Sequence, residues 1–210
     1  MELEKTDQEQ VEQLQQWWRE NRLALIVGLA VGIGGLVGWE QWQRSSESRS
    51  MQASVMFEDV SRAVAVENAD RADTALAALQ EAYPGSVYVV EALAMRAALA
   101  AKSDDWAAAE EYLQQALNSG PEPVLAGMLR LRLARAQWAG GNAENALSTL
   151  DKAIPEAYSG SREELRGDIE YARGNLEAAR AAWEKALPML AGSPAVDALN
   201  AKLARVGGSS

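Results

Sequence analysis

The stretch NLEAARAAWEKALP, residues 175–188, places Ala179, Trp183 and Ala186 on one face of a helix. Three earlier stretches repeat this order of an alanine, a bulky apolar residue four positions later, and a second alanine three positions after that. The repeated triplets are Ala75–Leu79–Ala82, Ala109–Leu113–Ala116 and Ala146–Leu150–Ala153. Successive triplets begin 34, 37 and 33 residues apart, which indicates a chain built from a repeated unit.

The boundaries of the units follow the same period. Each unit ends in a proline, which cannot continue a helix. These prolines are Pro84, Pro121, Pro155 and Pro188. Inside the units, Gly141–Asn142 and Gly174–Asn175 are typical of a left-handed helix end followed by a new helix start. Ser103–Asp105 and Asp70 predict N-caps at the corresponding turns.

Each unit also has a small residue where its first helix would cross its second, twelve positions before the triplet. These residues are Ala63, Ala97, Ala134 and Gly167. The unit resembles the tetratricopeptide repeat, a helix–turn–helix of about 34 residues, although most of the large aromatic residues of that consensus are missing. The alternative is an alanine-rich bundle with accidental periodicity. We predict an all-α fold: a tetratricopeptide-like α-solenoid of about four helix pairs over residues 53–206, with a capping helix near Pro194–Val206.

Residues 23–39, LALIVGLAVGIGGLVGW, are uncharged and have no polar face. As a helix they would extend about 26 Å, close to the roughly 30 Å thickness of the hydrocarbon core of a membrane. Tryptophan pairs flank the stretch, as is typical of residues at the two membrane interfaces. We therefore predict one transmembrane helix over residues 23–42. A buried core helix is the alternative, and the acidic leader disfavours a cleaved signal peptide.

The predicted span divides the chain into parts with different surroundings. The nearest cations are Lys5, Arg19 and Arg22 before it, and Arg44 and Arg49 after it. This modest excess places the amino terminus in the cytoplasm and the repeat domain beyond the membrane. The predicted parts are an acidic cytoplasmic tail (1–22), the transmembrane helix (23–42), a polar stalk or hinge (43–52), the repeat domain (53–206) and a frayed tail (207–210).

The sequence contains no cysteine and no histidine. It therefore lacks a thiol nucleophile, a thiolate metal site, the commonest general base and the commonest transition-metal ligand. Adjacent carboxylates such as Glu110–Glu111 and Glu163–Glu164 point apart on a helix and do not converge. We expect no enzymatic activity, no catalytic residue, no metal and no cofactor.

The charge of the chain disfavours a nucleic-acid partner. The net charge is −10, and residues 41–210 carry 17 cations against 23 anions. Phosphate backbones would be repelled on average. The local exception is Arg130, Arg132 and Arg135, which we interpret as solvated side chains on one helix.

The first helix of each unit would line a concave face, where tetratricopeptide arrays generally bind peptides or partner helices. Helical spacing places apolar, aromatic and charged residues of the third and fourth units on this face, and such residues carry much interface energy. The predicted partner-binding residues are Met128, Leu131, Arg135, Trp138, Asp168 and Tyr171. The alternative is that these residues fill the core, to which we assign Trp106 and Trp183. The equivalent positions of the second unit offer little: Glu91, Ala94, Ala98 and Ala101.

Three glycines share one face of the predicted span: Gly28, Gly32 and Gly35. Small residues allow two membrane helices to approach closely. We therefore expect this face to pack against other membrane helices.

The whole arrangement resembles the YfgM-like ancillary subunits of the SecYEG translocon in Gram-negative bacteria. The resemblance covers nearly the full chain and is most specific at WWRENRLALIVGLAVGIGGLVGWEQW (17–42), LRLARAQ (131–137) and LRGDIEYARGNLEAARAAWEKAL (165–187). It implies a single-pass inner-membrane protein with a periplasmic repeat domain. It also implies association with the translocon and with a membrane-anchored periplasmic chaperone resembling a peptidyl-prolyl isomerase.

The function that the sequence favours is a membrane-tethered adaptor. The resemblance implies that it helps to pass exported polypeptides from the translocon to the periplasmic chaperone network. Tethering holds the modules at high effective concentration, so individually weak contacts suffice. The alternative function is a periplasmic scaffold for envelope or cell-division assemblies.

Overall fold

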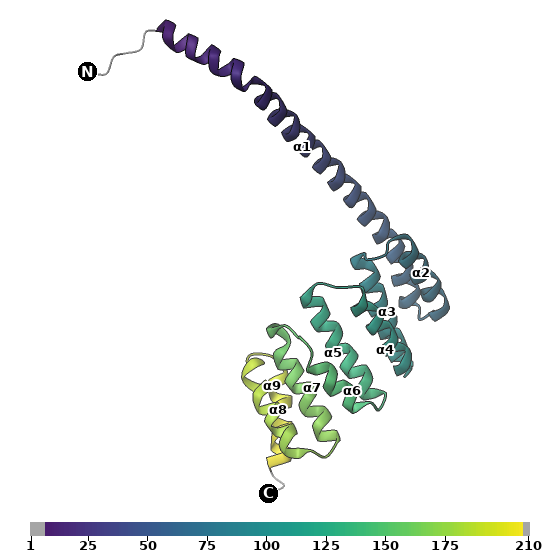
Figure 1. The fold of residues 1–210 in the computed structure, drawn as a ribbon. Helices are drawn as coiled ribbons and strands as arrows, with labels where there is room; N and C mark the ends of the chain where they lie inside the picture. The colour runs from purple at the N-terminus through teal and green to yellow at the C-terminus, as the bar shows by residue number, and fades with distance from the viewer. Residues whose placement is uncertain (1–6, 208–210) are drawn as a thin grey trace, which may run out of the picture. The chain divides into compact units, whose positions relative to one another are not determined.

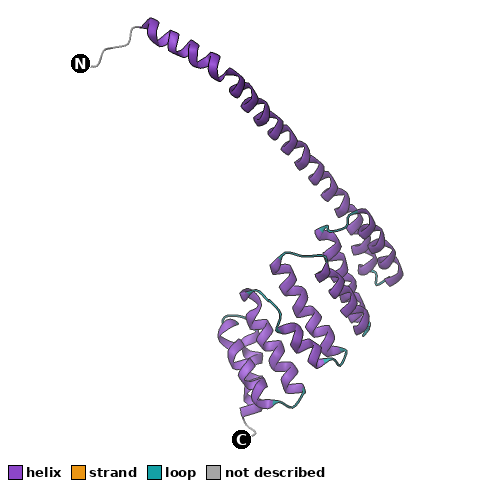
Figure 2. Ribbon diagram, viewed as in Figure 1, coloured by secondary structure: helices purple, strands orange, loops and turns teal. Residues whose placement is uncertain are grey.

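The computed structural model describes residues 7–207, and the secondary structure of these residues is helical, without a strand (Figure 2). Residues 1–6 of the predicted acidic tail and residues 208–210 of the predicted frayed tail lie outside the described residues. The chain divides into two compact units, Met1–Met51 and Gln52–Ser210.

The first unit consists of the larger part of helix α1, Asp7–Ala65, which has 59 residues. The helix includes both the predicted span over 23–42 and the predicted stalk or hinge over 43–52. Within the described part of the chain, no single helix is long and apolar enough to cross a membrane. The segments Leu14–Ala24 and Ile26–Ala65, bent by 44°, meet that requirement only as a pair. The transmembrane helix therefore stays a prediction.

The second unit contains the end of α1 and eight further α-helices within the described residues (Figure 1). Their bounds are α2 Ala69–Ala82, α3 Val87–Lys102, α4 Trp106–Asn118, α5 Pro123–Ala139, α6 Ala143–Leu150, α7 Ser159–Ala172, α8 Leu176–Met189 and α9 Ala195–Gly207, with a 3₁₀ turn η1 at Glu156–Tyr158. Helices α3 with α4, α5 with α6, and α7 with α8 form hairpins, and α9 packs on α8. The predicted all-α solenoid with a final capping helix is confirmed.

The turns between paired helices form largely as their residues predict. Gly141 and Gly174 have φ values of 89° and 83°, the left-handed conformation that glycine adopts without strain. The side chain of Asp105 caps α4 by accepting a hydrogen bond from the N–H of Ala108. The predicted cap at Asp70 is wrong, because α2 begins two residues earlier. Asn68 caps that helix through the N–H of Arg71, at 2.9 Å, and Asp70 lies in its first turn.

Two of the four predicted triplets do not form as expected. In α2 the buried residues are Ala72, Leu76 and Leu79, which have the same spacing but start three positions earlier, and Ala82 is exposed. Helix α6 ends at Leu150, so Ala153 lies beyond it and is exposed. The predicted helix stop at Pro188 is also displaced, because α8 includes Pro188 in its last turn and ends at Met189.

The small crossing residues are buried in all four pairs: Ala63, Ala97, Ala134 and Gly167. The fourth pair shows why the size matters. A Cβ built on Gly167 would lie 2.9 Å from Cε2 of Trp183, and closer still to Cδ1 and Nε1. Trp183 occupies the position that a leucine holds in the other triplets, so its larger ring requires a glycine on the facing helix. Trp183 itself is 2 % exposed, which confirms it as a core residue.

Candidate functional site

The six predicted partner-binding residues are distributed over α5 and α7, and they do not form one site. Leu131 is only 4 % exposed and packs in a core cluster with Leu150 and Ile169. Its inclusion in the exposed face is therefore wrong: it lies on the side of α5 that faces α6 and α7. Met128 is half-buried. The remaining four residues line two separate hollows in the surface of the domain.

We call the first hollow the terminal pocket, because it lies at the carboxy-terminal end of the solenoid. Its volume is about 210 Å³. The lining residues are Trp138, Asp168, Tyr171, Ala172, Trp183, Lys202 and Arg205. Three of the six predicted residues therefore meet here. The rings of Tyr171 and Trp183 lie 5.6 Å apart at 41°, and Tyr171 is 42 % exposed, so the pocket offers an accessible aromatic edge.

Two charged residues of the terminal pocket, Asp168 and Lys202, are paired with each other. Asp168 accepts hydrogen bonds from Nε1 of Trp183 at 3.0 Å and from Nζ of Lys202 at 2.9 Å. Lys202 also donates to Glu164 at 3.0 Å. Burial by itself lowers the pKa of Lys202, but the hydrogen bonds to Asp168 and Glu164 outweigh it and raise that pKa above its ordinary value. Asp168 thus joins α7 to α8 and α9.

We call the second hollow the alanine groove, and Arg135 is the predicted residue that lines it. The groove lies between α3, α4 and α5, and its volume is about 320 Å³. The lining residues are Ala94, Ala97, Ala98, Ala101, Trp106, Ala109, Leu113, Arg132, Arg135 and Ala136. Trp106, which was assigned to the core, is half-buried and forms part of this wall.

The alanine groove is not predicted from the sequence, because the small residues of the second unit carry no functional group that indicates a binding site. The signal was present in the spacing: Ala94, Ala98 and Ala101 repeat at four and three positions, on one face of α3. Small side chains on a concave face leave space. That space becomes a groove only where neighbouring helices supply walls, and these helices are distant in sequence.

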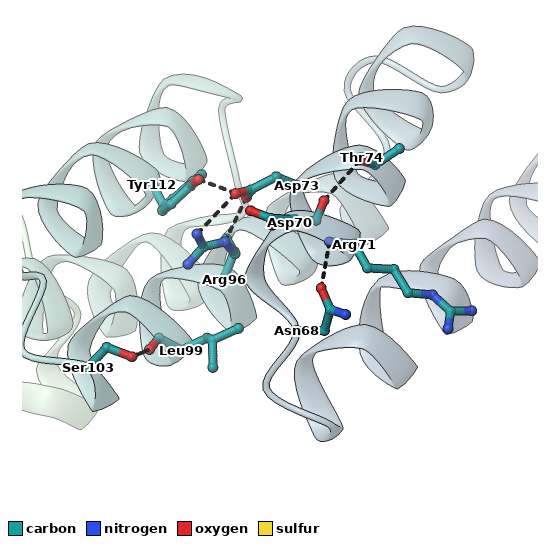
Figure 3. Close-up of polar contacts among 9 residues, drawn as sticks. All are labelled: Asn68, Asp70, Arg71, Asp73, Thr74, Arg96, Leu99, Ser103 and Tyr112. Carbon is teal, nitrogen blue, oxygen red and sulfur yellow. Dashed lines mark hydrogen bonds and ion pairs between the residues drawn. The ribbon is translucent and has the colours of Figure 1, made fainter.

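A half-buried charged cluster joins two of the helices that line the alanine groove to α2 (Figure 3). Nε of Arg96 donates to Oδ1 of Asp73 at 2.6 Å, and its NH2 group donates to Oδ2 at 3.0 Å. The hydroxyl of Tyr112 donates to the same carboxylate at 2.8 Å, and the guanidinium lies 4.9 Å from the centre of the Tyr112 ring. These contacts join α2, α3 and α4.

The electrostatics of this cluster favour its charged state. The hydrogen bond from Arg96 lowers the pKa of Asp73 below its ordinary value, against the opposing effect of burial. Burial and the hydrogen bond to Asp73 raise the pKa of Tyr112. Among the described residues, no group of three or more acidic side chains gathers as a metal ion would require. The hydrogen bonds of the cluster hold α3 and α4, two of the helices that line the groove, against α2.

The fold and the hollows define a tetratricopeptide-like solenoid with a surface suited to protein partners. A family model described as a tetratricopeptide repeat-like domain matches residues 15–208. Three relatives carry the name ancillary SecYEG translocon subunit. The relative from Haemophilus influenzae is 34 % identical over 165 residues, which is 78 % of this chain and 80 % of the relative. The relative from Escherichia coli K12 is 30 % identical over 186 residues, which is 88 % of this chain and 88 % of the relative. The relative from Aggregatibacter actinomycetemcomitans is 27 % identical over 168 residues, which is 78 % of this chain and 80 % of the relative.

The chain belongs to the tetratricopeptide repeat-like family of ancillary SecYEG translocon subunits.

Proposed function

We propose that this protein is a membrane-anchored adaptor of the SecYEG translocon that helps to pass exported polypeptides to periplasmic chaperones. In this proposal the amino terminus is cytoplasmic, the helix over 23–42 crosses the inner membrane, and the repeat domain lies in the periplasm. A membrane-anchored chaperone of the peptidyl-prolyl isomerase type is the proposed receiving partner. The names of the three relatives support the association with the translocon.

The observation that carries the proposal is the exposure of the apolar stretch in α1. Leu23, Val31 and Leu36 are 72 %, 70 % and 71 % exposed. A long run of exposed apolar residues indicates a membrane or another apolar partner.

The glycine face supports a role for the anchor beyond attachment. A Cβ built on Gly28, Gly32 or Gly35 would meet nothing within 4 Å. The absence of side chains on this face lets a second membrane helix approach closely. We propose that the face packs against a translocon helix or the anchor of the partner chaperone.

In the repeat domain, the proposed partner surface comprises the exposed Arg135 in the alanine groove and, at the terminal pocket, the exposed Tyr171 with the half-buried Trp138. Asp168 acts here as a positioning residue, because its hydrogen bond holds Trp183, whose ring contacts Tyr171, and its ion pair holds Lys202 over the Trp183 ring. The natural absence of histidine and cysteine agrees with a binding function, since no nucleophile or proton shuttle is needed.

The proposal is tested by purification from membranes in mild detergent. The full-length protein should carry translocon subunits with it, and replacement of residues 23–42 by an unrelated apolar span should reduce their yield. A triple Gly28→Leu, Gly32→Leu, Gly35→Leu variant keeps the span apolar and should show the same reduction. Recovery of the protein in the aqueous fraction, or without translocon subunits, would contradict the proposal.

The orientation has its own test, because the chain has no cysteine and single labels are unambiguous. Ala78→Cys lies in the repeat domain and Gln16→Cys lies before the predicted span, and both positions are exposed. In spheroplasts, a membrane-impermeant maleimide should label Ala78→Cys and leave Gln16→Cys unlabelled until the membrane is permeabilised. The reverse pattern would overturn the proposed orientation.

A further inference from the structure

The alanine groove is open because three helices place small side chains around it. Helix α3 contributes Ala94, Ala98 and Ala101, which lie on one face, and the other walls come from α4 and α5. The volume of about 320 Å³ is at the lower end of the range of about 300–1,000 Å³ that ligand pockets occupy. The groove therefore fits one or two side chains of a longer segment. Trp106 supplies a large flat surface at its wall.

The rim of the groove is cationic and its charges are uncompensated. Arg132 and Arg135 are three positions apart on α5, so their side chains leave the same side of the helix. Both are exposed, and among the described residues no ion pair is formed by either of them. Their neighbour Arg130 differs, because it donates to the carbonyl oxygen of Ala153 at 2.6 Å.

This rim stands out against a domain of opposite sign. Residues 41–210 carry 23 anions and 17 cations, and several other arginines of the domain are held in ion pairs, among them Arg96 with Asp73 and Arg166 with Asp151. Two exposed arginines beside an apolar hollow complement a carboxylate next to an apolar side chain, because guanidinium and carboxylate form paired hydrogen bonds. The net negative charge of the domain disfavours a nucleic acid as the source of that anion.

We propose that the alanine groove binds an extended polypeptide segment in which an aromatic side chain is flanked by acidic residues. The aromatic side chain enters the space over Ala98 and packs against Trp106. The carboxylates pair with Arg132 and Arg135 at the rim. This inference rests on the proposed adaptor function and names the class of segment that the adaptor selects.

The binding test uses the full-length protein in detergent and short fluorescein-labelled peptides, read by fluorescence anisotropy. The probe peptide carries two glutamates flanking one phenylalanine. Matched peptides replace both glutamates by glutamine, or the phenylalanine by alanine. We expect each replacement to weaken binding about tenfold, and the affinity of the probe to fall as salt is raised, because the ion pairs are exposed.

Two variants of the groove separate its charge from its space. The double variant Arg132→Glu with Arg135→Glu reverses the rim and should weaken the probe peptide by tenfold or more. Ala98→Leu fills the space over the exposed Ala98 and should weaken the probe peptide and the glutamine peptide, while binding of the alanine peptide should change little. The matched controls are Arg71→Glu with Lys152→Glu for charge, and Ala78→Leu for size, because these exposed residues do not line the groove.

The outcomes distinguish this inference from the proposed function. Equal binding of the glutamate and glutamine peptides, or unchanged binding by Ala98→Leu, would overturn the inference. If translocon subunits still co-purified with the protein in that case, the adaptor function would stand and only the segment class would be wrong. Binding that is lost in the groove variants and kept in the controls supports the inference.

Discussion

The terminal pocket and the alanine groove are both hollows between a helix pair and its neighbour, but they differ in how completely the chain fills them. In the terminal pocket, Trp183 occupies the space above Gly167, and Asp168 and Lys202 neutralise each other. In the alanine groove, alanines leave the space open and two arginines remain without an ion pair among the described residues. The same repeat thus yields a packed helix crossing beside the terminal pocket and an open groove near the middle of the domain.

The size of the central side chain accounts for much of this difference. Residue 113 is a leucine facing the alanine at 97, whereas residue 183 is a tryptophan facing the glycine at 167. Glycine has no side chain, so a glycine in place of alanine on one helix leaves room for a larger ring on the other. The buried ring fills the crossing of the fourth pair and contributes stability, while Tyr171 beside it stays accessible. In the second pair, the smaller side chains leave the crossing itself open as a groove.

The largest effect on stability is expected at the packed crossing of α7 and α8. Trp183→Ala should lower the free energy of unfolding by about 3–5 kcal/mol, because it removes a buried ring and leaves a cavity. Trp106→Ala should cost clearly less, since Trp106 is half-buried at the wall of the groove. Urea unfolding of both variants measures the difference. Equal losses would show that the two hollows are packed alike.

Gly167→Ala tests the same contact from the facing helix. The added methyl group would overlap the Trp183 ring, and overpacking of this kind costs about 1–3 kcal/mol. A second change, Trp183→Leu, restores the alanine–leucine pairing of the other units and should recover part of the stability of Gly167→Ala. If the double variant lost more free energy of unfolding than the two single variants together, the two residues would not be matched in size.

The cluster beside the alanine groove predicts a dependence on pH. The pKa of Asp73 is lowered in the folded protein, so its contribution to stability is present above the ordinary value of 3.8 and is lost as pH falls through the folded pKa. Asp73→Asn should lower the free energy of unfolding by about 1.5 kcal/mol near neutral pH and remove this part of the acid dependence. If the free energy of unfolding fell with decreasing pH equally in the variant and the unaltered protein, Asp73 would not be the source of this acid dependence.

The smallest effect is expected in the groove itself. Ala98→Leu changes an exposed position to another good helix former, so the free energy of unfolding should stay within about 0.5 kcal/mol. Thermal unfolding checks this before any binding experiment. A large loss of stability would mean that Ala98 is tightly packed and that the groove is not open space.

Much of the fold follows from local patterns in the sequence. The period of the triplets and the small crossing residues predict paired helices, because the geometry of a helix crossing is set by residues close in sequence. The register of α2 was missed because ADTALAALQEA has alanine or leucine on more than one face, so its pattern fits two rotations of the helix. Leu131 was misplaced for a related reason, since a rotation of α5 by one position moves it from the concave face to the core.

The surface features were less predictable, because they depend on residues far apart in the chain. Asp73 forms hydrogen bonds with Arg96 and Tyr112, which are 23 and 39 residues away in the sequence, and no sequence motif predicts these contacts. The alanine groove needs walls from three helices, and alanine gives no sign of chemistry in a sequence. Trp138, Asp168 and Tyr171 were found together because aromatic and charged residues at helical spacing do carry such a sign.

Photo-crosslinking in intact membranes tests most directly whether the two surfaces contact the translocon or exported polypeptides. A photoreactive residue is placed at Ala98 in the groove, at Tyr171 at the terminal pocket, or at Ala78 outside both. We expect adducts with translocon subunits or exported polypeptides at Ala98 and Tyr171, and none at Ala78. The same adducts at all three positions, or adducts with lipid alone, would contradict this expectation.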